Sequence, residues 1–162
     1  MTRAPAQPTV RAATLDDLPR VCELAQDLAA LHHEAWPSQF APPAAGTRDE
    51  AHWRDSLAGA DRAGFVAELD GAVVGFMTLV VAQDVHSVLQ PRRYVRVNSI
   101  CVDREVRGRG VGSALMAQAE AWGRSQGASE VRLVVWAFNR TALRLYEELG
   151  YELRSHTMGK ML

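Results

Sequence analysis

Three glycines within five residues constrain this chain more than any other feature of its sequence. They are Gly108, Gly110 and Gly112, and a strand-like apolar run precedes them while a helix-like run follows. Glycine has no Cβ, so its backbone N–H groups lie open to a ligand, and the start of a helix adds a positive dipole end. Such a loop suits an anion that carries several phosphates. The alternative interpretation is a tight strand-to-helix turn that happens to contain glycine.

Two widespread phosphate-binding motifs do not fit this loop. A loop of the GxxxxGK[ST] kind needs a lysine after its last glycine, and none follows Gly110 or Gly112 at that spacing. A dinucleotide fingerprint needs a glycine at position 113, which is Ser113. The pattern that does fit is R-x-x-G-x-G over residues 107–112, between a strand and a helix.

The composition is that of an ordinary soluble globular protein. The 162 residues are 48% hydrophobic and 23% charged, and the length suggests one domain over residues 9–162 after a flexible lead-in over 1–8. A formal net charge of -1 argues against a general affinity for nucleic acid. Arg104, Arg107 and Arg109 nevertheless form a local basic cluster around the glycines.

The chain carries no signal that predicts a membrane or an oxidising environment. No apolar run approaches the length of a membrane span, and the first ten residues lack the apolar stretch of a secretion signal. The two cysteines, Cys22 and Cys101, are far apart and belong to no CxxC pair. We therefore expect a cytoplasmic protein with two reduced thiols.

Strand-like and helix-like segments alternate along the chain. Strands are expected at 9–14, twice within 63–83 around an Asp70-Gly71 turn, at 94–102, at 130–138 and at 151–162. Helices are expected from Thr14 to Leu31, from Thr47 to Leu57, at 111–126 and from Asn139 to Leu149. The order predicts one α/β domain with a mixed sheet.

Some of these segments carry more detailed expectations. Residues 32–46 hold three prolines and a glycine, which predicts a loop, and Thr47 with Glu50 forms a capping box for the helix that follows. The run 130–138 is apolar almost throughout, which predicts a central strand covered on both faces. The segment 151–162 is strand-like and is expected at a sheet edge.

Residues 94–151 resemble the GNAT superfamily of N-acetyltransferases. The resemblance rests on three parts in order: the R-x-x-G-x-G loop, Asn139 at the start of a later helix, and Tyr146 seven residues on, followed by "EELGY". It implies a GNAT-like fold, with a mixed central sheet of six to seven strands, about four helices, and a splay in the sheet at the acyl-CoA site. It also implies acetyl-CoA as the acetyl donor and no metal.

The resemblance also assigns residues to the cofactor. The loop amides around the pyrophosphate would come from Arg107, Gly108, Arg109, Gly110, Val111, Gly112 and Ser113. The main chain of Ile100, Cys101 and Val102 would run beside the pantetheine arm as an added strand would. Asn139 would contact the pantetheine, and Tyr146 would lie beside the sulfur.

The chemistry of acetyl transfer needs some of these groups independently. A neutral amine attacks the thioester, a backbone N–H near Ile100 can stabilise the oxyanion, and the departing thiolate needs a proton. The Tyr146 phenol can supply that proton. On its helix Tyr146 also lies on the apolar side, so a core tyrosine is the alternative interpretation.

The general base is less clear, because the sequence departs from the family pattern there. Many members carry a glutamate about where Asn98 stands, and an amide cannot accept a proton at neutral pH. A water held by Asn98, a loop residue (Glu34, Asp84 or His86), or no base at all are the alternatives.

Two nearby features invite other kinds of chemistry. Cys101 lies close to the expected thioester, but strand alternation should turn it away from Asn98, Ile100 and Val102, which favours a buried structural thiol. His32 and His33 suggest a metal site, but adjacent side chains diverge and no third ligand is suitably spaced.

The acceptor side is outlined only in part. In the family the region between the first two helices covers the acceptor groove, where Glu34 would pair with a cation and Trp36 and Phe40 would form an apolar wall, with Asp84 as a further contact. A small amine, a peptide N-terminus or a lysine suits the near-neutral charge better than a nucleic-acid or membrane target. Related acetyltransferases often form dimers, so a homodimer is expected.

Three functions remain open at this point. The first is acetyl transfer from acetyl-CoA to a primary amine. The second is a module of the same fold that binds acyl-CoA as a sensor without turnover, which Asn98 favours and Tyr146 opposes. The third is an unrelated α/β phosphate-binding protein, which the missing lysine and the Asn139–Tyr146 pair oppose.

Overall fold

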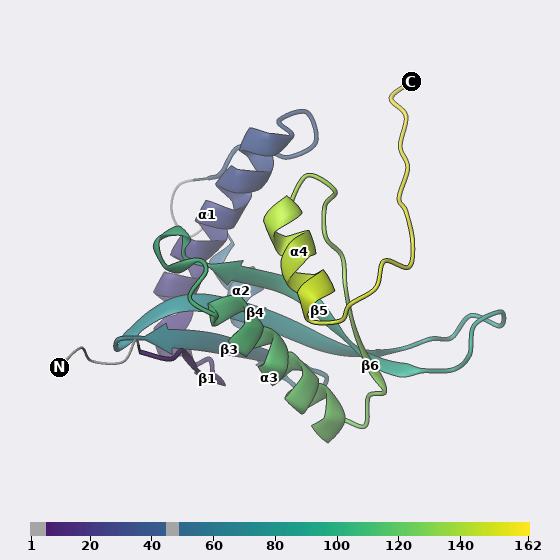
Figure 1. Ribbon diagram of the computed structural model, residues 1–162, viewed down its shortest axis with the longest axis horizontal. Coiled ribbons are helices and arrows are strands. Elements are labelled where there is room, and N and C mark those ends of the chain that lie inside the picture. Colours follow the sequence, from purple (N-terminus) through teal and green to yellow (C-terminus); the bar gives the residue numbers. More distant parts are fainter. Residues whose placement is uncertain (1–5, 45–48) are drawn as a thin grey trace.

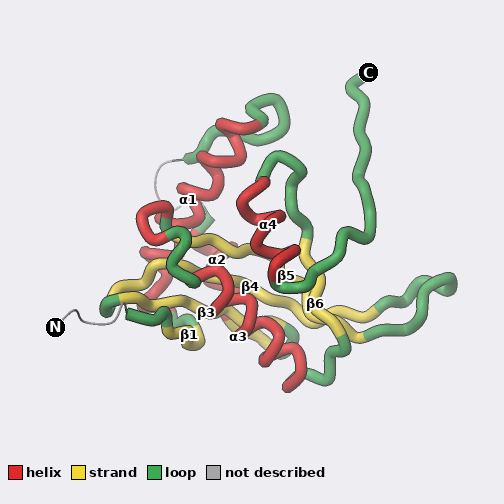
Figure 2. The backbone as a smooth tube through the Cα atoms, in the orientation of Figure 1, coloured by secondary structure: helices red, strands yellow, loops and turns green. Residues whose placement is uncertain are grey.

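A mixed β-sheet with helices on both faces forms the body of the protein (Figure 1). The computed structural model describes residues 6–44 and 49–162. Its strands are β1 (Thr9–Ala12), β2 (Ala58–Gly59), β3 (Arg62–Leu69), β4 (Ala72–Gln83), β5 (Arg93–Val102) and β6 (Glu130–Leu133). Its α-helices are α1 (Leu18–Ala35), α2 (Glu50–Leu57), α3 (Val111–Ser125) and α4 (Arg140–Glu148). Figure 2 shows how the strands cross behind α3 and α4.

The described strands are ordered β1-β3-β4-β5-β6, with β2 beside β3. Neighbours are antiparallel except β5 and β6, which run parallel. The turn between β3 and β4 has positive φ at Asp70 (52°) and Gly71 (82°), as a two-residue hairpin turn requires. The predicted α/β architecture with a mixed sheet is therefore confirmed.

Two apolar clusters hold the helices against opposite faces of the sheet. Phe76 and Cys101 pack with Leu24 of α1 on one face. Met77 and Val95 pack with Leu115 of α3 on the other face. Since Phe76 and Met77 are neighbours on β4, side-chain alternation along the strand separates the two clusters.

The first helix starts as expected but ends later. Thr14 and Asp17 form the expected reciprocal capping box, here at a short 3-10 turn over Leu15–Asp17 that leads into α1. The helix then continues to Ala35. His32 and His33 are therefore helical, although the sequence analysis expected them in a loop. Proline is the strongest helix breaker, and the first one after the apolar stripe is Pro37.

Two strand predictions are wrong for the single chain. The run 130–138 was expected as a central strand, but β6 has four residues, lies last in the sheet order and pairs with β5 alone. The next residue, Val134, is 83% exposed. Residues 151–162 form no strand, and all of them after Tyr151 are exposed. An apolar strand needs a partner to become central, and the described single chain offers none on that side.

Two expectations concern residues that the structure does not describe. Thr47, the expected cap of α2, lies outside the described residues, as do residues 1–5 of the expected lead-in; residues 6–8 are neither helix nor strand. Among the described helices, none has the length and apolar character needed to cross a bilayer.

Alanine substitutions at two glycines, one on β4 and one in α3, test how closely these elements are packed. A Cβ at Gly75 on β4 would lie 2.9 Å from the Cys101 carbonyl oxygen, whereas a Cβ at Gly123 in α3 would meet Val95 at 3.4 Å, an ordinary contact. Gly75→Ala should therefore lower the free energy of unfolding by about 1–3 kcal/mol. Gly123→Ala should raise it by up to about 1 kcal/mol, because alanine favours the helix. Urea denaturation of both variants checks this, and equal effects would contradict the packing.

Candidate functional site

The parallel ladder between β5 and β6 stops halfway along β5. Its pairs run from Tyr94 with Glu130 to Val97 with Leu133, and no pair follows in the described residues. From Asn98 onward, β5 keeps its antiparallel partner β4 and has no strand of the described chain on its other side. The expected splay of the sheet is therefore present. An unpaired strand edge of this kind can pair with an extended ligand.

A β-bulge marks the point where the strands part. Ser99 pairs with Thr78 and Val97 pairs with Leu79, so Asn98 is one extra residue in β5. A bulge bends its strand and shifts the side-chain alternation by one. The Asn98 side chain is exposed, and its Oδ1 accepts a hydrogen bond from Arg96 Nε at 2.8 Å.

The bulge corrects one expectation about which side chains share a face. Val95, Val97, Ile100 and Val102 all contact the cluster on the α3 side, although strict alternation would put the last two opposite the first two. Asn98 was expected on the face of Ile100 and Val102, and that expectation is wrong because the extra residue reverses the alternation. Ile100 and Val102 border the unpaired edge with their main chain.

The glycine loop lies at the end of β5 and leads directly into α3. After Val102 come a 3-10 turn (Arg104–Val106) and then Gly108 and Gly110, with φ of 79° and 80°. These left-handed conformations favour glycine strongly. A Cβ at either position would meet no atom within 4 Å, so the surface here is bare backbone at the start of a helix.

Glycine is needed at position 112 for a different reason, which is the close approach of another helix. A Cβ there would lie 2.8 Å from Leu145 Cδ2 of α4. This glycine therefore allows α4 to lie close to the first turn of α3. The three glycines serve two purposes: two shape the loop, and the third brings the helix that carries Tyr146 next to it.

The loop is surrounded by exposed basic side chains. Arg104, Arg107 and Arg109 are exposed, and Arg109 makes only a long contact of 3.4 Å to Asp70. Asp103 at the loop entrance pairs with Arg20 at 2.5 Å, which offsets its charge, and Glu105 is the other carboxylate of this segment. A hydrogen bond from the Glu105 backbone and this arginine keep the pKa of Asp103 below its usual value. Residues 103–110 therefore carry three arginines against two carboxylates, one of which is paired with Arg20.

Helix α4 places Asn139 and Tyr146 on the same side of the sheet as α3. Asn139 caps the helix, because its side chain accepts a hydrogen bond from the Ala142 N–H at 3.1 Å. Its Oδ1 is thus occupied, while its amide NH₂ remains a donor. Tyr146 is 7% exposed and packs in the cluster that includes Val95 and Val97 of β5.

The Tyr146 side chain is largely buried, and its hydroxyl has no charged partner among the described residues. Burial raises its pKa to about 12, and no hydrogen bond to it is found within the described chain. Its ring lies edge-on to Tyr151 at 6.1 Å. The phenol therefore keeps its proton at neutral pH and has a free donor near the end of the β5–β6 ladder.

Cys101 faces away from this side. Its thiol is 4% exposed, packs against α1 and lies 3.2 Å from the Leu24 carbonyl oxygen, to which it donates. Burial raises its pKa to about 12. The thiol is therefore protonated and covered, as expected of a structural cysteine.

Aromatic side chains from two distant segments meet above the splayed strands. Phe40 lies 4.9 Å from His32 and 4.9 Å from Trp136, and Trp36 lies 6.1 Å from Trp136. Phe138 contacts both His32 and Phe40. We call these five residues the aromatic patch. It joins the end of α1 to the segment between β6 and α4.

His32 is the titratable member of the aromatic patch. Burial lowers the pKa of its imidazole. This effect outweighs a hydrogen bond with the Leu28 backbone, which raises the pKa. The ring is therefore neutral at pH 7 and can accept a proton. His33 instead contacts the Phe40 carbonyl oxygen at 2.7 Å. Within the described residues, no three His, Cys, Asp or Glu side chains gather in a way that could hold a metal ion.

The structure places the other expected acceptor residues in two regions. Glu34 is exposed in the last turn of α1, next to the aromatic patch. Asp84 lies at the far end of β5, where it binds Arg132 through both oxygens at 2.8 and 2.6 Å. That hydrogen-bonded pair lowers the pKa of Asp84. His86 lies beyond it in the exposed loop between β4 and β5. The structure does not bring Asp84 or His86 to the splay.

Sequence reasoning missed Trp136, Phe138 and His32 as parts of this region. Trp136 and Phe138 lie in the run 130–138, whose pattern predicts one continuous strand. The strand ends at Leu133, so both residues lie in the segment that follows it. His32 was weighed only as a metal ligand. The prolongation of α1 to Ala35, which places His32 against Phe40, follows from the absence of a helix breaker before Pro37.

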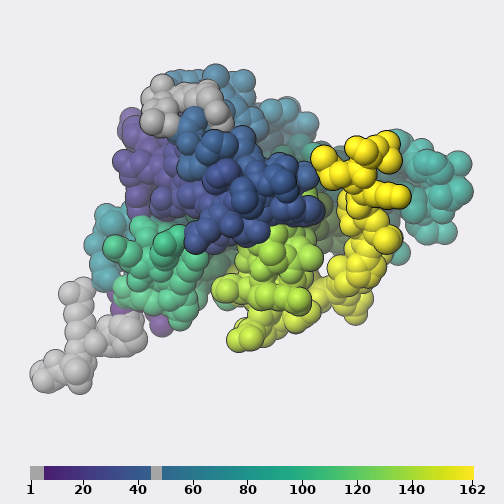
Figure 3. All heavy atoms as spheres, turned by 90° about the horizontal axis from the view of Figure 1, so that it is seen from above, coloured from purple at the N-terminus to yellow at the C-terminus, as the bar shows by residue number. Residues whose placement is uncertain are grey.

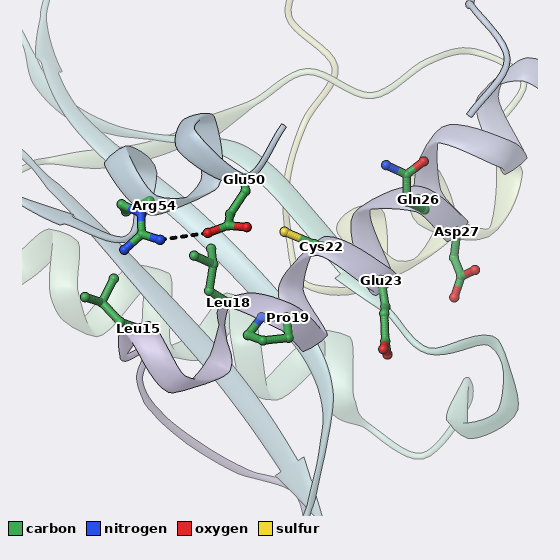
Figure 4. Close-up of a pocket in the computed structure, with 9 residues that line it drawn as sticks. All are labelled: Leu15, Leu18, Pro19, Cys22, Glu23, Gln26, Asp27, Glu50 and Arg54. Atoms are coloured by element: carbon green, nitrogen blue, oxygen red, sulfur yellow. Dashed lines mark hydrogen bonds and ion pairs between the residues drawn. The ribbon is translucent and has the colours of Figure 1, made fainter. Parts of the chain in front are cut away.

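A groove in the described part of the chain lies elsewhere. It is lined by residues of α1, α2 and the turn before α1, among them Cys22, Gln26 and Arg54 (Figure 4). None of its lining residues belongs to the glycine loop, α3 or α4. This groove is therefore separate from the site at the end of β5.

A family model for acetyltransferases of the GNAT family matches residues 25–151. The chain belongs to this family. The match includes β5, the glycine loop and α4, which are the elements that build the splay and its surroundings. GNAT membership, expected from the three motifs, is therefore confirmed.

Two relatives illustrate the range of the GNAT sequences that this chain resembles. It is 37% identical over 109 residues to the L-amino acid N-acetyltransferase AaaT of Escherichia coli strain K12, which covers 62% of this chain and 60% of that protein. It is 33% identical over 164 residues to the mycothiol acetyltransferase of Thermobispora bispora, which covers 93% of this chain. The chain spans 41 to 60% of the length of the first curated relatives that it matches.

Solved structures agree on the fold. A mutant of the BH1408 protein from Bacillus halodurans has a TM-score of 0.87 at 22% identity and covers 95% of this chain and 99% of that one. The aminoglycoside N-acetyltransferase AAC(6')-Iy in complex with CoA has a TM-score of 0.72 at 20% identity, with 95% and 98% covered. At these identities the likeness establishes the fold alone.

The burial of Cys101 makes a testable difference to its reactivity. At mildly alkaline pH, iodoacetamide should modify the half-buried Cys22 in the folded protein and leave Cys101 unmodified, because the Cys101 thiol is covered and protonated. Both should react in urea. Peptide mapping by mass spectrometry checks this, and modification of Cys101 in the folded protein as fast as in urea would contradict the buried thiol.

Proposed function

We propose that the protein transfers an acetyl group from acetyl-CoA to a primary amine. The observation that carries the proposal is a single arrangement: the unpaired edge of β5 ends in the glycine loop, and Tyr146 lies on the adjoining face. An edge for an extended arm, a cradle for phosphates and a protonated phenol are the parts that this reaction needs from its protein.

The residues present fit CoA as a ligand. Gly108 and Gly110 leave open space where side chains would stand, and the N–H groups of the first turn of α3 face outward beside exposed arginines. These groups would hold the pyrophosphate, through the amides from Arg107 to Ser113. The main chain of residues 100–102 would pair with the pantetheine arm, and the free amide of Asn139 would donate to it. Bound acetyl-CoA supplies the activated acetyl group.

The roles of this chain's own groups follow from the electron balance of the transfer. The amine nitrogen forms a bond to the thioester carbon, the C–S bond breaks, and the electron pair leaves with sulfur. A backbone N–H near Ile100 would stabilise the negative oxygen. Tyr146, whose pKa of about 12 keeps it protonated, would donate its proton to the thiolate.

The proton of the amine leaves by another route. Asn98 cannot accept it, and its Oδ1 is already bound to Arg96. His32 is neutral at pH 7 and lies in the aromatic patch, so it or a water molecule would take the proton. Asp84 is left out, because Arg132 occupies both of its oxygens.

The aromatic patch is proposed as the acceptor wall. It carries exposed Trp36 and part of Phe40, and Glu34 lies in the last turn of α1, two residues from both His32 and Trp36. These side chains suit an amine with an apolar or aromatic group beside it, held by contact with rings and by the carboxylate. The printed names of the relatives refer to L-amino acids, mycothiol and aminoglycosides, so the acceptor has to be found by experiment.

One observation favours a second candidate, a protein that binds acyl-CoA without turnover. Position 98 carries an amide where a carboxylate base is common in the family, and the structure gives that amide a partner in Arg96. The two candidates share the cofactor site and differ in catalysis. Release of free CoA thiol from acetyl-CoA across a panel of amino acids, aminoglycosides and peptides separates them: turnover with any amine supports the enzyme, and tight CoA binding without turnover supports the sensor.

The phosphate cradle is best tested at Ser113, because changes at Gly108 or Gly110 strain the backbone. Ser113→Asp adds a negative charge to the first turn of α3 with ordinary helical geometry. It should weaken CoA binding by about tenfold or more, since like charges repel at short range. Ser125→Asp, at the other end of α3, adds the same charge away from the loop and should leave binding unchanged. Calorimetric titration with CoA checks both, and equal affinities would place the cradle elsewhere.

Tyr146→Phe tests the proton donor. The ring stays in its cluster, so folding and CoA affinity should remain near those of the parent, while turnover falls by about 100- to 10,000-fold. Tyr151→Phe removes a neighbouring hydroxyl that contacts Glu120 and should keep most of the activity. If Tyr146→Phe turns over as fast as the parent with the best amine found, Tyr146 is a core residue only.

A further inference from the structure

Arg96 carries an exposed guanidinium that no carboxylate neutralises, at the point where the sheet splays. Its Nε donates a hydrogen bond to Asn98 Oδ1 at 2.8 Å, and Asn98 is the bulge residue that follows the last pair of the β5–β6 ladder. Among the described residues, this amide is the one side-chain partner of Arg96. The terminal nitrogens of the guanidinium therefore remain free donors that are held beside the opening of the sheet.

The neighbouring arginine on β6 is bound differently. Arg132 is the register partner of Arg96, and it donates to both oxygens of Asp84 at 2.8 and 2.6 Å and also contacts Glu130. Its charge is therefore balanced within the fold, whereas Arg96 holds only a neutral amide. A planar guanidinium with free N–H groups is the side chain best suited to bind a carboxylate, through two parallel hydrogen bonds.

The register places the Arg96 side chain on the face of the sheet that α1 covers. Arg96 pairs with Val80 of β4, and Val80 follows Phe76 by four residues, so their side chains share one face. Phe76 packs in the cluster of α1. The last turns of α1 carry His32, while Trp36 follows the helix, and both belong to the aromatic patch. The guanidinium therefore projects on the side of the sheet where the aromatic patch lies.

The segment after β6 brings the aromatic patch close to the splay. Leu133 is the register partner of Val97, and Trp136 follows Leu133 by three residues, which span at most about 10 Å. Trp136 in turn contacts Trp36 and Phe40. Figure 3 shows the end of α1 and the loop after it (dark blue) directly beside the region around α4 (yellow-green). A small acceptor can therefore contact the rings and the guanidinium at the same time.

We propose that the acceptor is an α-amino acid with an apolar or aromatic side chain, and that Arg96 binds its carboxylate. This inference rests on the proposed acetyl transfer and names the acceptor class of the same site. The carboxylate pairs with the free N–H groups of Arg96, and the side chain packs on the rings. The amine nitrogen bonds to the acetyl carbon, and sulfur leaves with the electron pair of the C–S bond. The amine loses one proton and the thiolate gains one, so the products are an N-acetyl amino acid and CoA thiol.

The short distance from Arg96 to the reacting edge favours an amine that carries its own carboxylate. The guanidinium is held beside Asn98, the first residue of the unpaired edge, and the proposed oxyanion donor near Ile100 lies about 7 Å further along the strand. An α-amino acid fits this spacing, because its carboxylate and its amine share one carbon atom. A peptide lysine or an amino sugar has no carboxylate beside its amine and would leave the guanidinium without an anion.

Two acceptors that differ only in the carboxylate test the proposal. The full chain should acetylate L-phenylalanine with a kcat/KM about 100-fold above that for 2-phenylethylamine. Arg96→Leu should lower kcat/KM for L-phenylalanine by about 100-fold, mainly through KM, and should change that for 2-phenylethylamine less than about threefold. Arg93→Leu is the matched control: this exposed arginine of the same strand donates to the Gln126 carbonyl oxygen, and its loss should change neither value. Equal losses for both acceptors in Arg96→Leu would mean that Arg96 only holds Asn98, which overturns the proposal.

The acceptor class and the acetyl transfer fail in different ways. Turnover of other amines without turnover of apolar amino acids overturns the acceptor class and leaves acetyl transfer standing, whereas CoA binding without turnover of any amine overturns both. Calorimetric titration with the product N-acetyl-L-phenylalanine, in the presence of CoA, gives a readout besides activity. Its affinity should fall at least about tenfold in Arg96→Leu and stay the same in Arg93→Leu. Equal affinity for the product in the parent and in Arg96→Leu would contradict the carboxylate site.

Discussion

The site depends on one extra residue in a strand. Asn98 interrupts the pairing of β5 with β4, and the parallel ladder of β5 with β6 ends at the residue before it. A bulge bends its strand and turns the following residues by one position. Ile100 and Val102 consequently point toward the α3 cluster while their backbone borders an open edge. The pairing with β6 ends at the same point, so the outer edge of residues 98–102 has no partner strand among the described residues.

The remaining parts of the site are placed by packing against the same strand. Gly75 on β4 lets the Cys101 carbonyl, Val111 and Leu115 approach, so α3 begins close to the end of β5. Gly112 then lets Leu145 of α4 approach the first turn of α3. The glycine loop, the helix start and Tyr146 therefore belong to one packed unit. Glycine allows the left-handed backbone conformations of the loop, and it also allows α3 and α4 to pack closely together.

Local signals in the sequence predicted most of this unit. The Asp70-Gly71 turn, the Thr14–Asp17 cap, the glycine loop and the Asn139 cap all act through neighbouring residues, and the structure contains each of them. The bulge at Asn98 was not predicted, because it depends on the register with β4, which is set by distant residues. Trp36 and Phe40 were predicted as an apolar wall, but the contribution of Trp136, Phe138 and His32 to the aromatic patch was missed for the same reason, because Phe40 and Trp136 meet only once the sheet is built. The apolar pattern of the run 130–138 predicted one long strand, but only residues 130–133 form one, because the pattern does not show which segments pair with it.

The central claim is that the unpaired edge of β5 is a ligand-binding strand edge, and amide hydrogen exchange with and without ligand tests it most directly. CoA should slow exchange in the glycine loop and also at residues 99–102. 3′-Phospho-ADP, which has the phosphates and lacks the pantetheine arm, should slow exchange in the loop alone. If CoA binds and protects the loop while residues 99–102 exchange as they do in the free protein, the arm does not lie along β5 and the account of the splayed sheet is contradicted.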